Sequence, residues 1–137
     1  MQQTYKMTIA GCERSLPLCP VNEKLDIAAF VMFGDVELTE KAAAELLKKC
    51  PEHDIIVTAE TKGIPLAYEM ARQGCGRYFV ARKATKLYMT HPLEVAVRSI
   101  TTDHLQHLYL SEEEAEQIKG KRILIADDVI STGESLN

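Results

Sequence analysis

Arg122-Ile-Leu-Ile-Ala-Asp127-Asp128-Val-Ile-Ser131-Thr132-Gly133-Glu134-Ser135 is the stretch of sequence that decides the fold. Its apolar run is typical of a strand buried on both faces, and two adjacent carboxylates follow directly. The hydroxyls and the glycine of the next turn lead into an expected helix start, which is a favourable site for phosphate. Carboxylates repel phosphate, so Asp127 and Asp128 must face sugar hydroxyls or a divalent metal. A phosphorylated ribose satisfies both halves of the motif.

The alternative is a purely structural role, in which the two aspartates only cap a turn. Adjacent acids after an apolar strand, followed by Ser-Thr-Gly-x-Ser, are too specific a combination for that alternative to be favoured. The sequence contains no Gly-Lys-Ser/Thr and no Gly-x-Gly-x-x-Gly, which excludes a P-loop and a dinucleotide-binding fingerprint.

Upstream of this stretch, the chain alternates between short apolar runs and one helical segment. Asp54–Ala59 and Tyr78–Ala81 are predicted to be buried strands, with a helix over Ile64–Arg72 between them. Strand, helix and strand at this spacing predict a right-handed parallel arrangement. The expected fold class is therefore α/β, a parallel twisted sheet flanked by helices, with its ligand at the carboxyl ends of the strands.

The N-terminal part of the sequence is less regular. Residues 5–9 alternate as in a half-buried strand, after which Gly11, Pro17 and Pro20 are expected to break regular structure. A helix is predicted over residues 25–33. A second helix is predicted from Glu40, with Thr39 as its cap and a stop before Pro51.

The region between residues 82 and 121 reads as an excursion from the sheet. Residues 95–100 and 105–110 are predicted strands, and Ser111–Glu114 has the capping-box spacing that starts a short helix before Gly120. Residues 84–92 are polar and without period, which favours a mobile loop.

Composition limits the possible functions. The 137 residues fit one domain, and 16 Lys and Arg against 20 Asp and Glu give a net charge of −4, which argues against a nucleic-acid-binding protein. No apolar run approaches the roughly 20 residues of a membrane span, and the start of the chain has no signal-peptide pattern. We expect a soluble, cytoplasmic protein with no membrane or nucleic-acid partner.

Several segments resemble the type I phosphoribosyltransferases. The stretch from Ile123 to Ser135 resembles their phosphoribosyl-pyrophosphate signature. Glu60-Thr-Lys-Gly-Ile-Pro-Leu-Ala67 resembles their pyrophosphate loop and is close to that of the orotate enzymes. Arg82-Lys-Ala-Thr-Lys86 resembles the start of their flexible catalytic loop, and Thr102-Asp-His-Leu105 resembles a motif of the adenine enzymes. The adenine and purine enzymes are the closest match, with some motifs of the orotate enzymes.

The resemblance implies a single phosphoribosyltransferase domain over residues 1–137. Residues 1–50 would form a small hood and a leading helix, and residues 51–137 a phosphoribosyl-pyrophosphate-binding core that is incomplete at its C-terminus. The implied reaction transfers ribose 5-phosphate from phosphoribosyl pyrophosphate to a nucleobase and releases pyrophosphate. The base is expected to be a purine, and adenine is the first choice. The expected cofactor is Mg²⁺, and the expected assembly is a homodimer.

Roles for individual residues follow from the same resemblance. Asp127 and Asp128 would hold the ribose hydroxyls and, through ribose or water, the metal. The 5′-phosphate would lie on Ser131, Thr132, Gly133, Glu134 and Ser135, and the pyrophosphate on Glu60, Thr61, Lys62 and Gly63. Arg82, Lys83 and Lys86 would close over the pyrophosphate, with Lys86 as a catalytic residue.

Two other functions stay open. The Lys-Gly-Ile-Pro-Leu-Ala match favours orotate as the base, although Thr102-Asp103 and the long excursion oppose it. The second alternative is a regulator of the same fold that senses phosphoribosyl pyrophosphate. Residues 1–50 show no basic recognition helix, which such a regulator would need to bind DNA.

Overall fold

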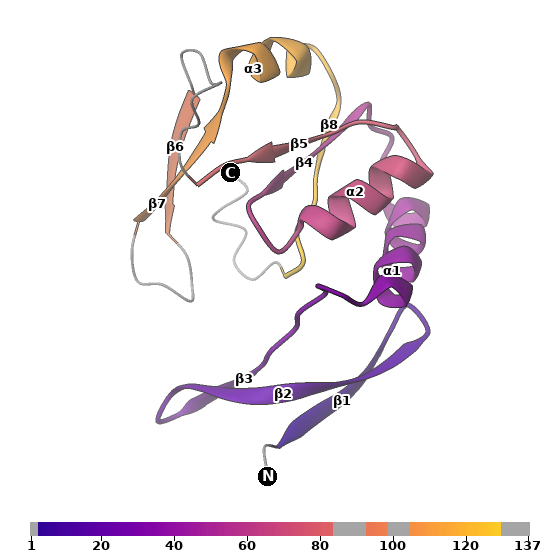
Figure 1. Cartoon of the computed structure of the whole chain (residues 1–137), viewed down its shortest axis with the longest axis vertical. Coiled ribbons are helices and arrows are strands. Elements are labelled where there is room, and N and C mark those ends of the chain that lie inside the picture. Colours follow the sequence, from indigo (N-terminus) through magenta and orange to yellow (C-terminus); the bar gives the residue numbers. More distant parts are fainter. Residues whose placement is uncertain (1–2, 84–92, 99–104, 130–137) are drawn as a thin grey trace.

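The computed structural model describes residues 3–83, 93–98 and 105–129, and its centre is a parallel sheet (Figure 1). The strands β4 (Ile55–Ala59), β5 (Tyr78–Ala81) and β8 (Ile123–Ile125) are arranged in the order β5-β4-β8. Both neighbours of β4 run parallel to it. The helix α2 (Ile64–Gln73) connects β4 to β5. The predicted parallel α/β arrangement is confirmed.

Two helices cover one face of this sheet. In Figure 1, α2 lies beside the sheet and α1 (Val36–Lys49) lies next to α2. Ile56 of β4, Leu66 and Met70 of α2 and Ala43 of α1 are all buried in one core cluster. The apolar side chains of the two helices therefore pack in one core with Ile56 of β4, and alternate residues of a strand share the face on which it lies.

The prediction that residues 122–126 form a strand buried on both faces is wrong in one respect. Leu124 packs against the core, but Ile123 and Ile125 are 45% and 43% exposed. They pair in register with Ile55 and Val57, so they point to the face that α1 and α2 do not cover. A strand covered on only one face leaves its alternate residues exposed.

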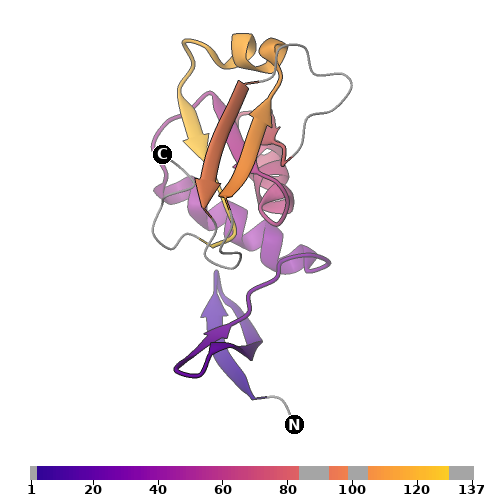
Figure 2. The same ribbon diagram turned by 90° about the vertical axis from the view of Figure 1, so that its left-hand side faces the viewer.

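The N-terminal residues form a separate antiparallel sheet of β1 (Thr4–Ile9), β2 (Cys12–Asn22) and β3 (Leu25–Ala28). Figures 1 and 2 show this sheet below α1, apart from the parallel sheet. The expected break at Pro17 and Pro20 is wrong, because β2 runs through both. In the register, residues 12–17 of β2 pair with β1 and residues 18–22 pair with β3. A proline nitrogen needs no hydrogen-bond partner, and the Pro17 carbonyl still accepts from the N–H of Ala29 at 2.8 Å.

The predicted helix over residues 25–33 is also wrong. Leu25–Ala28 is the strand β3, because pairing with β2 outweighs the helical tendency of a short apolar run. The residues that follow lead to Gly34, whose φ of 83° only glycine adopts readily, and then to the start of α1.

The helix α1 starts earlier than predicted. Its N-cap is Asp35, whose Oδ1 accepts from the backbone N–H of Leu38 at 3.1 Å. The expected cap, Thr39, lies inside the helix and its hydroxyl donates to the Asp35 carbonyl at 2.8 Å. Arg14 of β2 donates to Asp35 from Nε at 2.6 Å and from Nη2 at 3.0 Å. Asp35 therefore joins the N-terminal sheet to α1.

The excursion consists of the hairpin β6 (Leu93–Arg98) and β7 (Leu105–Leu110) followed by α3 (Glu112–Ile118). The predicted capping box is confirmed: Ser111 and Glu114 each accept a hydrogen bond from the other's backbone N–H. The loop predicted at 84–92 and the helix start predicted near residue 133 lie outside the described residues. None of the described helices is long and apolar enough to span a membrane.

Candidate functional site

The polar segments that follow β4, β5 and β8 lie along one edge of the parallel sheet. Register pairs Val57 of β4 with Ile125 of β8, and the N–H of Ala126 donates to the Val57 carbonyl at 3.0 Å. The N–H of Glu60 donates to the Ala81 carbonyl at 2.9 Å. These bonds bring the chain after all three strands to the same edge, where ligands bind in open α/β sheets.

Asp127 and Asp128 are partly buried at the carboxyl end of β8. Oδ1 of Asp127 accepts from the backbone N–H of Asp128 at 2.8 Å. Burial, reinforced by the neighbouring Asp128 side chain, raises the pKa of Asp127 to about 6. Neutral pH lies above this pKa, so the Asp127 carboxyl is mostly ionised there and its oxygens can accept hydrogen bonds from a ligand's hydroxyls.

Gly63 ends the turn that follows β4 and is packed directly against Asp127. A Cβ at Gly63 would lie 3.0 Å from Asp127 Oδ1, 3.2 Å from Asp127 Cα and 2.4 Å from the Thr58 hydroxyl. With a side chain at residue 63, the start of α2 could not approach β8 so closely. The peptide between Glu60 and Thr61 is cis.

The turn also opens α2. Gly63 is the N-cap of the helix, and its carbonyl accepts from the N–H of Ala67 at 2.9 Å. As a glycine it has no side chain to occupy the positive end of the helix dipole, which attracts anions. Thr61 and Lys62 are exposed on the same turn, so Lys62 adds a positive charge that a ligand can reach.

Glu60 connects the turn after β4 to the residues after β5. Its Oε1 accepts from the backbone N–H of Lys83 at 2.8 Å, and its Oε2 lies 3.9 Å from Nη1 of Arg82. Arg82 is further fixed by two backbone hydrogen bonds to Tyr109 of β7, at 2.8 and 2.7 Å. The Glu60 carboxylate therefore holds the two basic residues, and its predicted contact with pyrophosphate stays a prediction.

The predicted site residues that the structure describes lie at one edge of the sheet, where two contacts connect them. One contact joins Gly63 to Asp127, and the other joins Glu60 to Arg82 and Lys83. Lys86 and the turn of Ser131, Thr132, Gly133, Glu134 and Ser135 lie outside the described residues, and their roles remain predictions.

Sequence reasoning missed Thr58, which is buried beside Gly63 and Asp127. A signal was present in the sequence: Thr58 is a hydroxyl inside the apolar run 55–59 and shares the parity of the core residue Ile56.

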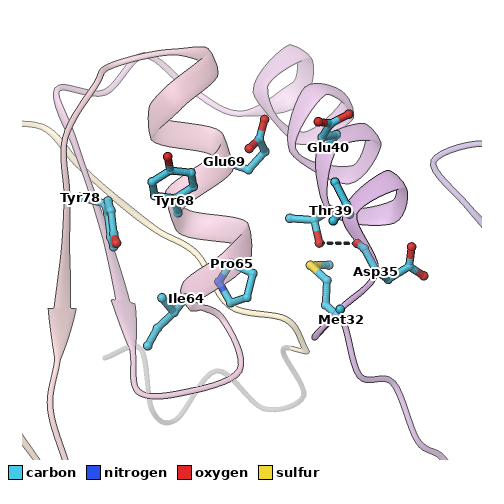
Figure 3. Close-up of a pocket in the computed structure, with 11 residues that line it drawn as sticks. Met32, Asp35, Thr39, Glu40, Ile64, Pro65, Tyr68, Glu69 and Tyr78 are labelled. Carbon is cyan, nitrogen blue, oxygen red and sulfur yellow. Dashed lines mark hydrogen bonds between the residues drawn. The ribbon is translucent and has the colours of Figure 1, made fainter.

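A hollow of about 340 Å³ lies between α1 and α2 (Figure 3). Tyr68 of α2 and Tyr78 of β5 meet edge to face in its wall, with their ring centroids 6.1 Å apart. Asp35, Glu40 and Glu69 also line it, and Arg14 pairs with Asp35 as Arg72 does with Glu69. The predicted site residues are absent from its lining, so the hollow is distinct from the sheet edge described above.

A family model for the phosphoribosyl transferase domain matches residues 32–137. The chain belongs to this family. The match includes the parallel sheet, the turn after β4 and the Asp127–Asp128 pair, so the resemblance inferred from the sequence motifs is confirmed.

Curated relatives agree with this assignment. The chain is 32% identical over 133 residues to a hypoxanthine/guanine phosphoribosyltransferase of Methanotorris igneus, covering 90% of this chain and 69% of that protein. It is 30% identical over 132 residues to a protein of the same name from Methanothermococcus okinawensis, with coverage of 90% and 68%.

A solved structure supports the fold of this phosphoribosyltransferase domain. The adenine phosphoribosyltransferase of Thermoanaerobacter pseudethanolicus matches with a TM-score of 0.67 at 18% identity, covering 88% of this chain and 70% of the other. At this identity the match concerns the fold, and the base that the chain uses has to be argued separately.

Proposed function

We propose that this protein is a purine phosphoribosyltransferase, which transfers ribose 5-phosphate from phosphoribosyl pyrophosphate to a ring nitrogen of the base. The single observation that carries the proposal is the Asp127–Asp128 pair packed against the Gly63 turn at the start of α2. Carboxylates suit ribose hydroxyls, and the helix start with Lys62 suits pyrophosphate. One ligand carries both groups.

In the proposed reaction the bond between C1 of the ribose and the pyrophosphate oxygen breaks, and pyrophosphate leaves with the electron pair. The base nitrogen then bonds to C1, and the proton of that nitrogen is released. No covalent enzyme intermediate is needed. The protein contributes position and charge: Asp127 and Asp128 orient the sugar, while Lys62, Arg82, Lys83 and Lys86 offset charge on the departing pyrophosphate.

Mg²⁺ is the cofactor that we propose, and the residues at the site fit it. Asp127 and Asp128 offer hard oxygen donors, and Mg²⁺ keeps several of its waters, so it needs few protein ligands. When bound, Mg²⁺ would neutralise charge on pyrophosphate and ribose oxygens.

Hypoxanthine and guanine are the first candidate bases, because the relatives of that name match over 90% of this chain. Adenine, predicted from the Thr102-Asp103-His-Leu105 motif, is the second candidate. A homodimer and a cytoplasmic location, both implied by the family resemblance, belong to the same proposal. Analytical ultracentrifugation tests the dimer.

A pyrophosphate-release assay tests the function. The protein is given phosphoribosyl pyrophosphate and Mg²⁺ with hypoxanthine, guanine, xanthine, adenine or orotate in parallel reactions. Release with hypoxanthine or guanine supports the first candidate, and release with adenine alone supports the second. Release with orotate alone contradicts a purine enzyme. Tight binding of phosphoribosyl pyrophosphate without release with any base would favour the regulator.

A further inference from the structure

Thr58 is the most deeply buried polar side chain close to the candidate site. It is 1% exposed and lies next to the last residue of β4. Within the described part of the chain its hydroxyl has no hydrogen-bond partner. Ile56, two residues earlier on the same face, belongs to the apolar core. A valine would fit such a position without leaving a buried hydroxyl unpaired.

An unpaired buried hydroxyl lowers stability, because it has lost its hydrogen bonds to water and gained none in return. Functional sites are among the places where proteins accept such a cost. Thr39 offers a contrast within the same molecule: it too is buried, but its hydroxyl donates to the Asp35 carbonyl at 2.8 Å. The Thr58 hydroxyl therefore calls for an explanation that Thr39 does not.

The surroundings of Thr58 point to Asp127. The point where a Cβ of Gly63 would stand is 2.4 Å from the Thr58 hydroxyl and 3.0 Å from Oδ1 of Asp127. The hydroxyl and the carboxylate oxygen therefore both lie close to the space that a side chain at residue 63 would fill. Among the described residues, Oδ1 accepts one hydrogen bond, from the N–H of Asp128, and a carboxylate oxygen can accept more than one.

We propose that Thr58 is a positioning residue for Asp127. This inference rests on the proposed function, in which Asp127 holds a ribose hydroxyl. When Asp127 turns to the sugar, the Thr58 hydroxyl donates to its carboxylate and holds the working orientation. The hydroxyl has no hydrogen bond before the ligand binds and gains one afterwards. Its presence therefore lowers the stability of the free protein and strengthens ligand binding.

The test compares Thr58→Val, which keeps the shape and removes the hydroxyl, with Thr58→Ser, which keeps the hydroxyl. Melting temperature and the Kd for phosphoribosyl pyrophosphate with Mg²⁺, from calorimetry, are measured for each protein. We expect Thr58→Val to melt at or above the wild-type temperature and to bind about tenfold or more weakly, the usual loss for a hydrogen bond to a charged group. Thr58→Ser should keep most of the affinity.

Thr39→Val is the matched control, because it removes a buried hydroxyl that is already bonded and lies outside the site. It should melt lower and bind phosphoribosyl pyrophosphate as the wild type does. Thr58→Val should lose affinity but not melting temperature, and Thr39→Val should lose melting temperature but not affinity. This contrast distinguishes a positioning residue from a purely structural one.

Two results would overturn the inference alone. Thr58→Val that binds like the wild type would make Thr58 an ordinary core residue, and Thr58→Val that melts well below the wild type would show that the hydroxyl is already bonded at rest. Failure of the wild-type protein itself to bind phosphoribosyl pyrophosphate would instead overturn the proposed function, and this inference with it.

Discussion

Arg122 and Asp54 are joined by three hydrogen bonds at the amino ends of β8 and β4. The backbone N–H and Nε of Arg122 donate to Oδ2 of Asp54 at 2.9 and 3.2 Å, and Nη2 donates to Oδ1 at 2.9 Å. In return, the N–H of Asp54 donates to the Arg122 carbonyl at 2.8 Å. This cluster supports the register of the two strands, and the register places Asp127 beside the end of β4 at the opposite edge.

The Asp54–Arg122 pair should make stability depend on acid pH. Arg122 holds the pKa of Asp54 at about 2, below its ordinary 3.8. In the folded protein the carboxylate therefore stays ionised while the unfolded chain takes up a proton, so its contribution is complete above about pH 4 and is lost as pH falls towards 2. When the pH is lowered from 4 to 2, the melting temperature of Asp54→Asn should fall by less than that of the wild type.

Asp26→Asn is the control for this measurement, because it removes an exposed aspartate of β3 outside the pair. Its melting temperature should follow the wild-type curve. If the Asp54→Asn curve also ran parallel to the wild type, the pair would contribute nothing to acid stability, as is the case for many exposed ion pairs.

Asp127→Asn combined with Asp128→Asn should abolish binding of phosphoribosyl pyrophosphate and leave the fold intact. Each hydrogen bond lost from an ionised group to a ribose hydroxyl should cost about 1.5–3 kcal/mol. Burial already raises the pKa of Asp127, which means that its charge is unfavourable at this position, so its removal should not lower the melting temperature. Calorimetric affinity equal to that of the wild type would contradict the assignment of the sugar site.

The parallel core could be predicted because its signals are local. The apolar runs at 55–59 and 78–81 and the turn residues between them are written in the sequence, and each forms its element almost within the predicted bounds. The capping box at Ser111 and Glu114 is equally local, with both partners three residues apart. The carboxylates of Asp127 and Asp128 follow directly on β8 as the sequence predicts, and their role in binding stays a prediction.

The N-terminal sheet could not be predicted because its signals are contacts between distant residues. Pro17 lies inside β2 at the point where the strand changes its partner from β1 to β3, which no local pattern reveals. Asp35 replaces Thr39 as the cap of α1, and Asp35 is held by Arg14, which is 21 residues away. The exposure of Ile123 depends on which face of the sheet the helices cover.

Lys86→Ala should reduce turnover more than it reduces substrate affinity. Lys86 lies outside the described residues, so this prediction rests on the resemblance of residues 82–86 to the catalytic loop of the family. Negative charge on pyrophosphate grows as the C1 bond breaks, and a lysine that meets it then lowers the barrier. We expect kcat to fall by about one hundredfold or more. A raised KM with normal kcat would show that Lys86 only binds substrate.

Glu60→Gln should strengthen the binding of pyrophosphate by roughly two- to fivefold, the scale of a partly exposed ion pair. The amide oxygen of glutamine can still accept from the N–H of Lys83, so the turn keeps its shape. The negative charge beside Arg82 disappears, which leaves more of the positive charge of that residue for the ligand. Titration calorimetry with pyrophosphate measures the effect.

Glu60→Ala is the companion variant, because it removes both the charge and the hydrogen bond to Lys83. It should gain less affinity than Glu60→Gln, or lose some, since the two loops are no longer tied. An equal loss of affinity in both variants would mean that the Glu60 carboxylate itself takes part in binding the ligand.

Gly63→Ala should weaken the site through steric contact alone. Gly63 has a φ of −82°, which alanine adopts without strain, so backbone conformation is not at issue. The new methyl group would meet the Thr58 hydroxyl at 2.4 Å and Asp127 Cα at 3.2 Å, and the backbone of β8 cannot move away as a side chain can. We expect a loss of about 1–3 kcal/mol in stability, as for an overpacked core. Displacement of Asp127 should also weaken the binding of phosphoribosyl pyrophosphate by about tenfold or more. A misplacement of about 1 Å at a site can cost roughly a hundredfold.

Gly120→Ala separates these two effects, because nothing lies within 4 Å of its Cβ position while its φ of +77° is unfavourable for alanine. It should lose about 1–2 kcal/mol of stability for the left-handed conformation and keep the affinity of the wild type. Denaturant unfolding and calorimetry on both variants give the comparison. If Gly63→Ala bound phosphoribosyl pyrophosphate as well as Gly120→Ala does, the close packing of the turn against Asp127 would not matter for the ligand, and the turn after β4 would have to be placed outside the site.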